Sequence, residues 1–212
     1  MSRTHLGRAT ALTPSQRLLY RALIDAVIDT GEAPTMETMS QRIGLSARET
    51  SQIAEELVEA DWIATDDEGT VTCVYPFSIA PTGINASWGT VERPMMCAVD
   101  ALGVAPMLDK PVLVRANCQH CNRAITIEVE PERLKKRTPR STVVIRRWTA
   151  GPAAANRCAA TRFACSPDHA QQWLHEHGGP DDVIQSLEAS FIEGRAVFGS
   201  AYRHGSSAHL NG

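Results

Sequence analysis

Hydrophobic residues recur at helical spacing three times in the first 60 residues of the chain. Between positions 13 and 30 a Thr-Pro pair opens the segment, apolar residues follow every three or four positions, and Gly31 closes it. Residues 35–43 and 47–60 repeat this spacing over shorter lengths, with a turn at Gly44 between them. The pattern predicts three amphipathic helices.

The next segment changes to the period of a β-strand. Ser46 and Glu49 form a capping box that begins the third helix. After this helix the run W-I-A-T-D-D-E-G-T-V-T-C-V-Y predicts two short strands around a D-E-G turn. Three helices followed by a hairpin indicate a winged-helix-like domain over residues 1–80.

DNA binding is the usual function of such a domain, with Arg48 on the recognition helix. However, the helix A-R-E-T-S-Q-I-A-E-E-L-V-E-A carries one Arg against four Glu, and the turn adds Asp66, Asp67 and Glu68. Acidic side chains repel phosphates. The charges therefore favour a structural role for this domain and predict no nucleic-acid partner.

From residue 70 onward the chain consists mainly of short β-rich runs. Four of them predict strands: V-T-C-V-Y-P-F-S-I, P-V-L-V-R-A-N-C, A-I-T-I-E-V-E and S-T-V-V-I-R-R-W. Between the first two, M-M-C-A-V-D-A-L-G-V-A-P-M-L predicts a buried helix that ends near Pro106.

The last third of the chain returns to helical spacing. It predicts a helix over Pro167–His177, an amphipathic stretch over Val183–Phe198 and a disordered polar tail. The fold class is therefore α+β. A mixed or antiparallel sheet with flanking helices forms a catalytic domain over residues 81–200, and residues 201–212 form the tail.

The charge and the apolar runs of the chain indicate where in the cell the protein works. The 212 residues carry a net charge of -3, so no global positive field attracts nucleic acid or an anionic membrane. No apolar run approaches the roughly 20 residues of a membrane helix, and the first residues lack the apolar stretch of a secretory signal. We expect a cytoplasmic protein without membrane contact. Its six cysteines are then reduced thiols or metal ligands, and any one of them can equally be a buried core residue.

The segment Cys97-Ala98-Val99-Asp100 has the most informative chemistry. Residues three apart on a helix lie on one face, so the thiol and the carboxylate should be close enough to exchange a proton. A carboxylate beside a thiol raises the thiol pKa, which is unfavourable for a simple nucleophile. The pair suits a soft metal that displaces the thiol proton onto the carboxylate. A buried thiol beside a capping carboxylate is the alternative interpretation.

A second group of cysteines is the C-x-x-C of Cys118 and Cys121. It could be half of a zinc site or a redox pair, and further zinc ligands could come from Cys158, Cys165, His169 and His175. The zinc interpretation is weakened because no second C-x-x-C is present. A redox C-x-x-C normally opens a helix, whereas the residues after this motif predict a strand. We therefore expect a structural hairpin with one buried cysteine.

The third group lies in R-C-A-A-T-R-F-A-C-S-P. If this stretch is a regular strand, Cys158 and Cys165 face opposite sides, because they are an odd number of positions apart. Only one of them can then reach a given site.

These residues carry a resemblance. The blocks M-C-A-V-D-A-L-G-V-A-P-M-L, V-L-V-R-A-N-C, I-T-I-E-V-E-P and R-C-A-A-T-R-F-A-C-S-P-D-H-A-Q-Q-W-L are similar, in order, to the organomercurial (alkylmercury) lyase family. The resemblance covers about residues 13–200. It implies protonolysis of a carbon–mercury bond by two cysteines and one aspartate, with Cys97 and Asp100 as the first pair. Cys118 matches a cysteine taken as structural in the family.

The second catalytic cysteine is where the chain departs from the family pattern. The family typically has adjacent cysteines in F-C-C-x-x-x-F-F, whereas N-R-C-A-A-T-R-F has one. An ungapped match places Arg157 on the catalytic position, and a shift of one residue restores Cys158. We assign Cys158, with Cys165 as the alternative.

The resemblance also implies the partners. Cys97, Cys158 and Asp100 would contact the mercury of substrate and product, and no bound cofactor is implied. Small thiols would remove Hg(II), and a mercuric reductase would accept it. Two other functions stay open: a metal-responsive winged-helix regulator, and a divergent protein of the lyase fold with another activity.

Overall fold

The computed structural model describes residues 12–147, 152–199 and 202. Helices and antiparallel sheets are combined, so the fold is α+β as predicted. The tail that was predicted to be disordered lies, apart from residue 202, outside the described residues. In the described part of the chain, no helix combines the length and apolarity that a membrane span needs.

Three helices form the N-terminal part, followed by a small antiparallel sheet with strand order β1-β2-β3. Their bounds are α1 Pro14–Thr30, α2 Met36–Ile43, α3 Ala47–Glu59, β1 Ile63–Thr65, β2 Val71–Val74 and β3 Phe77–Ser78. All three predicted helices and the predicted hairpin are present. The winged-helix description and the domain boundaries stay predictions.

The caps of these helices follow the sequence closely. Thr13 and Ser46 each accept a hydrogen bond within a capping box, and Gly31 ends α1 at φ 80°. Tyr20 of α1 donates a hydrogen bond to the Tyr75 carbonyl oxygen at 2.6 Å. This bond joins the helices to the chain that leaves β2.

A five-stranded antiparallel sheet with strand order β5-β4-β6-β7-β8 forms the centre of the second part. Its strands are β4 Ile84–Trp88, β5 Val91–Pro94, β6 Val112–Asn117, β7 Ala124–Glu130 and β8 Arg133–Thr138. The strands β4, β5 and β8 were not predicted. β5 and β8 lie at the two edges, where charged side chains replace the apolar alternation on which the prediction rests.

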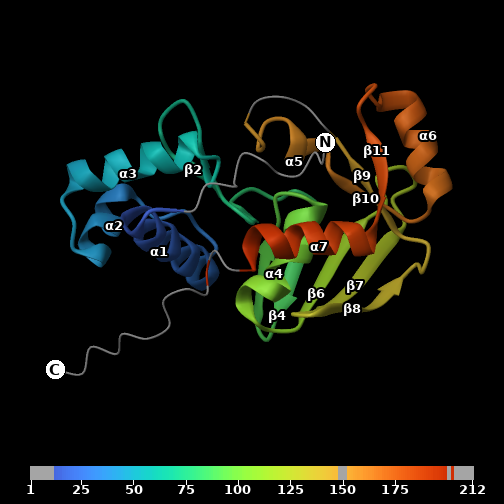
Figure 1. Cartoon of the computed structure of the whole chain (residues 1–212), viewed down its shortest axis with the longest axis horizontal. Helices are drawn as coiled ribbons and strands as arrows, with labels where there is room; N and C mark the ends of the chain where they lie inside the picture. The colour runs from blue at the N-terminus through green and yellow to red at the C-terminus, as the bar shows by residue number, and fades with distance from the viewer. Residues whose placement is uncertain (1–11, 148–151, 200–201, 203–212) are drawn as a thin grey trace.

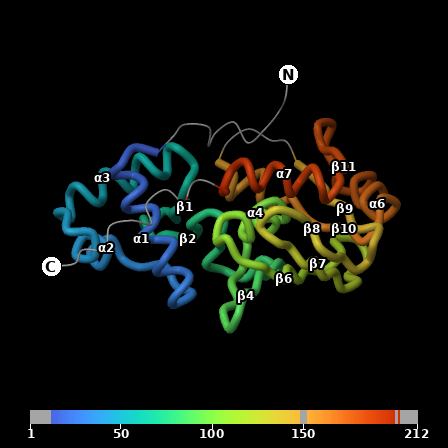
Figure 2. The backbone as a smooth tube through the Cα atoms, turned by 60° about the horizontal axis from the view of Figure 1, so that its bottom comes forward, coloured from blue at the N-terminus to red at the C-terminus, as the bar shows by residue number. Residues whose placement is uncertain are grey.

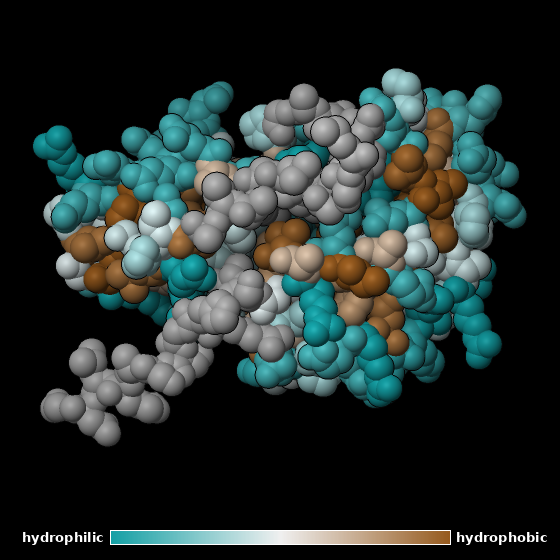
Figure 3. Space-filling view, viewed as in Figure 1, coloured by the Kyte–Doolittle hydropathy of each residue, from teal (hydrophilic) through white to brown (hydrophobic). Residues whose placement is uncertain are grey.

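Two helices pack against each other over this sheet, α4 Ala98–Leu108 and α7 Leu187–Phe198 (Figure 1). The first of them ends at Leu108, two residues beyond Pro106 and so close to the predicted end, and Asp109 follows it in the left-handed region. The predicted stretch 183–198 divides into a strand and α7. In Figure 3 part of the exposed apolar surface lies over α7, whose Ile192 is 66% exposed.

A third antiparallel sheet, with strand order β10-β9-β11, lies beside the five-stranded sheet, and α6 packs against it (Figure 2). Its elements are β9 Val143–Arg146, α5 Arg157–Ala160, β10 Arg162–Ala164, α6 Pro167–His177 and β11 Val183–Ser186. The condition of a regular strand through Cys158 and Cys165 is not met: Cys158 lies in the short helix α5, and Cys165 follows β10.

Candidate functional site

Cys97 and Asp100 lie together at the start of α4. Cys97 is the N-cap residue rather than a residue inside the helix, and its Sγ accepts a hydrogen bond from the Asp100 N–H at 3.5 Å. Asp100 lies in the first turn and is fully buried. The spacing of three therefore brings thiol and carboxylate together, although the thiol caps the helix instead of belonging to it.

Cys158 reaches the same place from α5. Its N–H donates to the Ala153 carbonyl at 2.8 Å, and the Ala98 N–H donates to the Thr161 carbonyl at 3.2 Å. Arg162 strengthens this junction, because its guanidinium donates to the carbonyl oxygens of Cys158 and Met96 at 3.0 and 3.2 Å. The backbone thus holds the end of α5 against the start of α4.

These three side chains form one cluster. The Sγ atoms of Cys97 and Cys158 and a carboxylate oxygen of Asp100 all lie within 4.8 Å of one another. Each of the three residues is 0% exposed. The cluster is therefore fully enclosed by the protein.

Burial dominates the electrostatics of the cluster. It raises the pKa of Cys97 well above its ordinary value, and the hydrogen bond with Cys158 and the charge of Asp100 raise it further. The charge of Arg146 acts in the opposite direction but does not outweigh them. Cys97 is therefore a thiol at neutral pH until something replaces its proton.

Arg146 and Glu193 are residues that the sequence reasoning missed. Arg146 at the end of β9 is 1% exposed and forms an ion pair with Glu193 of α7 at 2.5 Å. It also donates hydrogen bonds to Gln185 at 3.1 Å and Thr161 at 3.4 Å. A buried cation thus lies close enough to the cluster to stabilise negative charge there. Its sequence signal is an Arg at the end of an apolar strand, which is too common to be informative.

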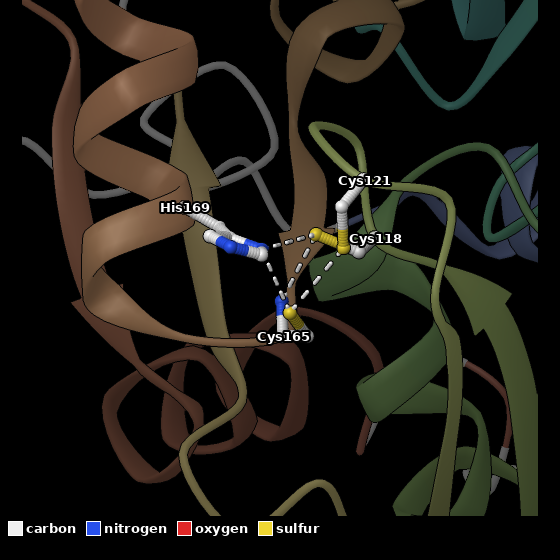
Figure 4. A group of neighbouring side chains, drawn as sticks. All are labelled: Cys118, Cys121, Cys165 and His169. Atoms are coloured by element: carbon white, nitrogen blue, oxygen red, sulfur yellow. Dashed lines mark hydrogen bonds between the residues drawn. The ribbon is translucent and has the colours of Figure 1, made fainter.

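A second cluster contains the C-x-x-C motif. Cys118 and Cys121 lie in the turn between β6 and β7, as the expected hairpin requires, and Cys118 is buried. Cys165, which follows β10, and His169, in the first turn of α6, point toward them (Figure 4). Cys165 therefore belongs to this cluster and not to that of Cys97. Of the four further candidate ligands, the structure brings two, Cys165 and His169, to the motif.

The comparisons with known proteins agree with this geometry. A sequence model described as MerB, alkylmercury lyase, matches residues 77–199, more than half of the chain. The chain belongs to the alkylmercury lyase family. The matched range contains both clusters.

Curated relatives in this family have similar length. The alkylmercury lyase of Clostridium butyricum is 26% identical over 204 residues, which cover 92% of this chain and 89% of the relative. That of Staphylococcus epidermidis is 26% identical over 184 residues, covering 85% and 82%. Both matches extend well beyond the residues that the family model covers.

A solved structure shows the same fold. The mercury-bound form of MerB2 superposes with a TM-score of 0.77 at 22% identity, covering 93% of this chain and 95% of the other. The agreement extends over nearly the whole chain, so the N-terminal helices belong to the shared fold.

Proposed function

We propose that this member of the family is an organomercurial lyase that cleaves R–Hg⁺ by protonolysis to R–H and Hg(II), with Cys97, Cys158 and Asp100 as catalytic residues. One observation carries the proposal: two thiols and one carboxylate, from α4 and α5, converge within 4.8 Å in a fully buried cluster. Thiolates are the preferred ligands of soft metals, and a carboxylate can accept and return a proton.

The reaction balances with these three groups. The first thiol loses its proton to solvent as its sulfur binds the mercury of R–Hg⁺. The second thiol then binds, and its proton passes to Asp100. Two sulfur ligands push electron density onto mercury, and Asp100 delivers its proton to the attached carbon, so that the carbon–mercury bond breaks. R–H leaves, and Hg(II) stays bound to Cys97 and Cys158.

The burial of the cluster affects both the strength of its electrostatic interactions and the access of a substrate to it. A low-dielectric surrounding strengthens the interactions of Asp100 and Arg146 with charge in the cluster. Since all three catalytic candidates are 0% exposed, a mercurial reaches them only after the covering segments move apart. We propose that α5 is the part that moves, because it supplies Cys158 and is only four residues long.

Product removal needs a partner. We propose that small thiols extract Hg(II) from the two cysteines and that a mercuric reductase accepts it, in a cytoplasmic setting where thiols are reduced. The reaction needs no bound cofactor. A metal-responsive DNA-binding regulator is the weaker alternative, because the family is enzymatic and helix α3 is acidic.

The test is the release of hydrocarbon. The reduced protein with excess small thiol should release methane from methylmercury or benzene from phenylmercury. Asp100→Ala should slow release by about 10² to 10⁴, the usual value of a placed proton donor, and should trap bound organomercurial visible by mass spectrometry. Cys97→Ser and Cys158→Ser should release almost none.

Cys73→Ser is the matched control, because Cys73 is a buried cysteine of β2 outside both clusters. It should retain turnover. Full turnover in Cys158→Ser would show that the second thiol is assigned wrongly. A wild-type protein that releases hydrocarbon from neither mercurial would refute the lyase proposal.

A further inference from the structure

The four side chains of the second cluster have the arrangement of a tetrahedral metal site. Their ligand atoms, three sulfurs and the Nδ1 of His169, all lie within 4.8 Å of one another. The Sγ atoms of Cys121 and Cys165 are 3.7 Å apart, and His169 Nδ1 lies 3.1 Å from Cys165 and 3.9 Å from Cys118 (Figure 4). Zn–S and Zn–N bonds in a tetrahedral site place two sulfurs about 3.8 Å apart and sulfur and nitrogen about 3.5 Å apart.

Backbone hydrogen bonds hold Cys118 in place in the turn that carries the C-x-x-C. The Cys118 N–H donates to the Arg123 carbonyl at 2.8 Å, and Asn122 lies in the left-handed region at φ 59°. The Cys165 N–H donates to Cys118 Sγ at 3.3 Å. Such N–H to sulfur bonds favour a thiolate, the form that binds metal.

We propose that Cys118, Cys121, Cys165 and His169 bind one structural Zn²⁺ ion. Three thiolates and one imidazole form a common structural zinc set, and four protein ligands leave no open position for a substrate. This site is separate from the proposed carbon–mercury chemistry, since its ligands share no residue with the cluster of Cys97.

The ion would join two sheets. Cys118 and Cys121 lie in a turn of the five-stranded sheet, whereas Cys165 follows β10 of the other sheet and His169 lies in α6, which packs against that sheet. The Gln119 N–H already donates to the Phe163 carbonyl of β10 at 2.9 Å. Since β10 directly follows the segment of Cys158, a bound ion would fix one end of that segment.

Metal content tests the proposal without reference to turnover. Wild type purified from zinc-containing medium under reducing conditions should carry about one zinc per chain by elemental analysis. Cys121→Ser and His169→Ala should lose it. Cys158→Ser should keep it, which separates this site from the catalytic one, as should Cys73→Ser and His120→Ala. The last is a stringent control, because the rings of His120 and His169 lie 5.0 Å apart.

A second measurement applies even if a variant fails to fold. A strong chelator should lower the unfolding temperature of wild type, and added Zn²⁺ should restore it. Replacement by Co²⁺ should give the visible bands of a tetrahedral thiolate site. Wild type that carries no zinc and is not stabilised by it would overturn the proposal, as would a Cys121–Cys165 disulfide or stoichiometric iron.

Discussion

Opposing effects act on the thiol of Cys97. The N-terminus of α4 and the nearby Arg146 favour a thiolate, whereas burial and the carboxylate of Asp100 favour the protonated form. Burial is the largest effect, so the pKa is raised. A residue in this state is inert toward ordinary electrophiles and reacts when a soft metal replaces its proton.

The raised pKa predicts a loss of stability at alkaline pH. In the unfolded chain Cys97 ionises near its ordinary 9.0, whereas in the folded protein it stays protonated. Above that pH the unfolded state binds fewer protons, so the free energy of unfolding should fall by up to about 1.4 kcal/mol per pH unit from this group. Denaturant unfolding at several pH values measures this decline in the free energy of unfolding. Cys97→Ser should show a shallower decline, and an unchanged slope would contradict the prediction.

Replacement of Arg146 should lower the free energy of unfolding. Arg146→Met leaves Glu193, whose pKa burial already raises, without its cation in a buried place. We expect a loss of about 3–5 kcal/mol in the free energy of unfolding. The matched control is Arg133→Met at the exposed Arg133–Glu130 pair, which should cost less than about 1 kcal/mol. Equal losses at the two sites would contradict the argument.

At the scale of elements, the contact between α4 and α7 positions Asp100. The two helices meet at Gly103 and Gly194, and a Cβ on Gly194 would lie 2.6 Å from the Val99 carbonyl oxygen and 3.0 Å from Gly103 Cα. These are backbone atoms, which cannot rotate away from the contact as a flexible side chain can. Small residues therefore set the distance between α7 and the helix that carries Asp100.

Gly194→Ala tests this contact. Alanine in a helix interior is normally more favourable than glycine by about 1 kcal/mol. Here the clash of the added Cβ with the Val99 carbonyl oxygen should make alanine the less favourable residue. We expect a net loss of about 1–3 kcal/mol, measured by denaturant unfolding. Gly179→Ala is the control, since its Cβ would meet nothing closer than 3.9 Å. A more stable Gly194→Ala protein would refute the prediction.

At the scale of the whole molecule, the N-terminal part holds the segment of Cys158. Asp61, in the turn after α3, accepts hydrogen bonds from the Ala153 N–H and the Arg157 guanidinium, both at 3.2 Å. Arg157 is the immediate neighbour of Cys158 in α5. The N-terminal helices thus contribute to the site through one carboxylate.

Asp61→Asn should therefore lower turnover although Asp61 is a positioning residue. Asparagine tolerates the φ of 59° and keeps an oxygen for Ala153, but it removes the charge that holds Arg157. Misplacing the second thiol should slow hydrocarbon release by up to about 10²-fold. Asp67→Asn in the exposed turn is the control. The rescue of turnover by a longer acid, Asp61→Glu, would support positioning over a loss of folding.

The charge of the N-terminal part predicts its behaviour toward DNA. Helix α3 carries Glu49, Glu55, Glu56 and Glu59 beside Arg48. A mobility shift should show no binding above the weak non-specific level, and Arg48→Ala should keep full turnover. Tight, salt-sensitive binding of the protein's own upstream DNA would favour the regulator.

The sequence by itself determined what depends on local spacing. It specified α1, α2 and α3 with their caps, the hairpin after them, and the proximity of Cys97 and Asp100. Apolar periodicity and cap residues act over one or two turns of chain, so no distant contact is needed to read them. The family resemblance of the sequence also favours Cys158 over Cys165 as the second thiol.

Only the tertiary structure decided which distant segments meet. It placed the cluster partners of Cys97, put Arg146 beside them, and joined Cys165 and His169 to the C-x-x-C motif. The segment of Cys158 is not one regular strand, because the eight residues 157–164 are of mixed polarity and fit a helix turn followed by a short strand equally well. Contacts between two sheets depend on how the sheets pack together, and the hydrophobic periodicity of a single strand does not predict that packing.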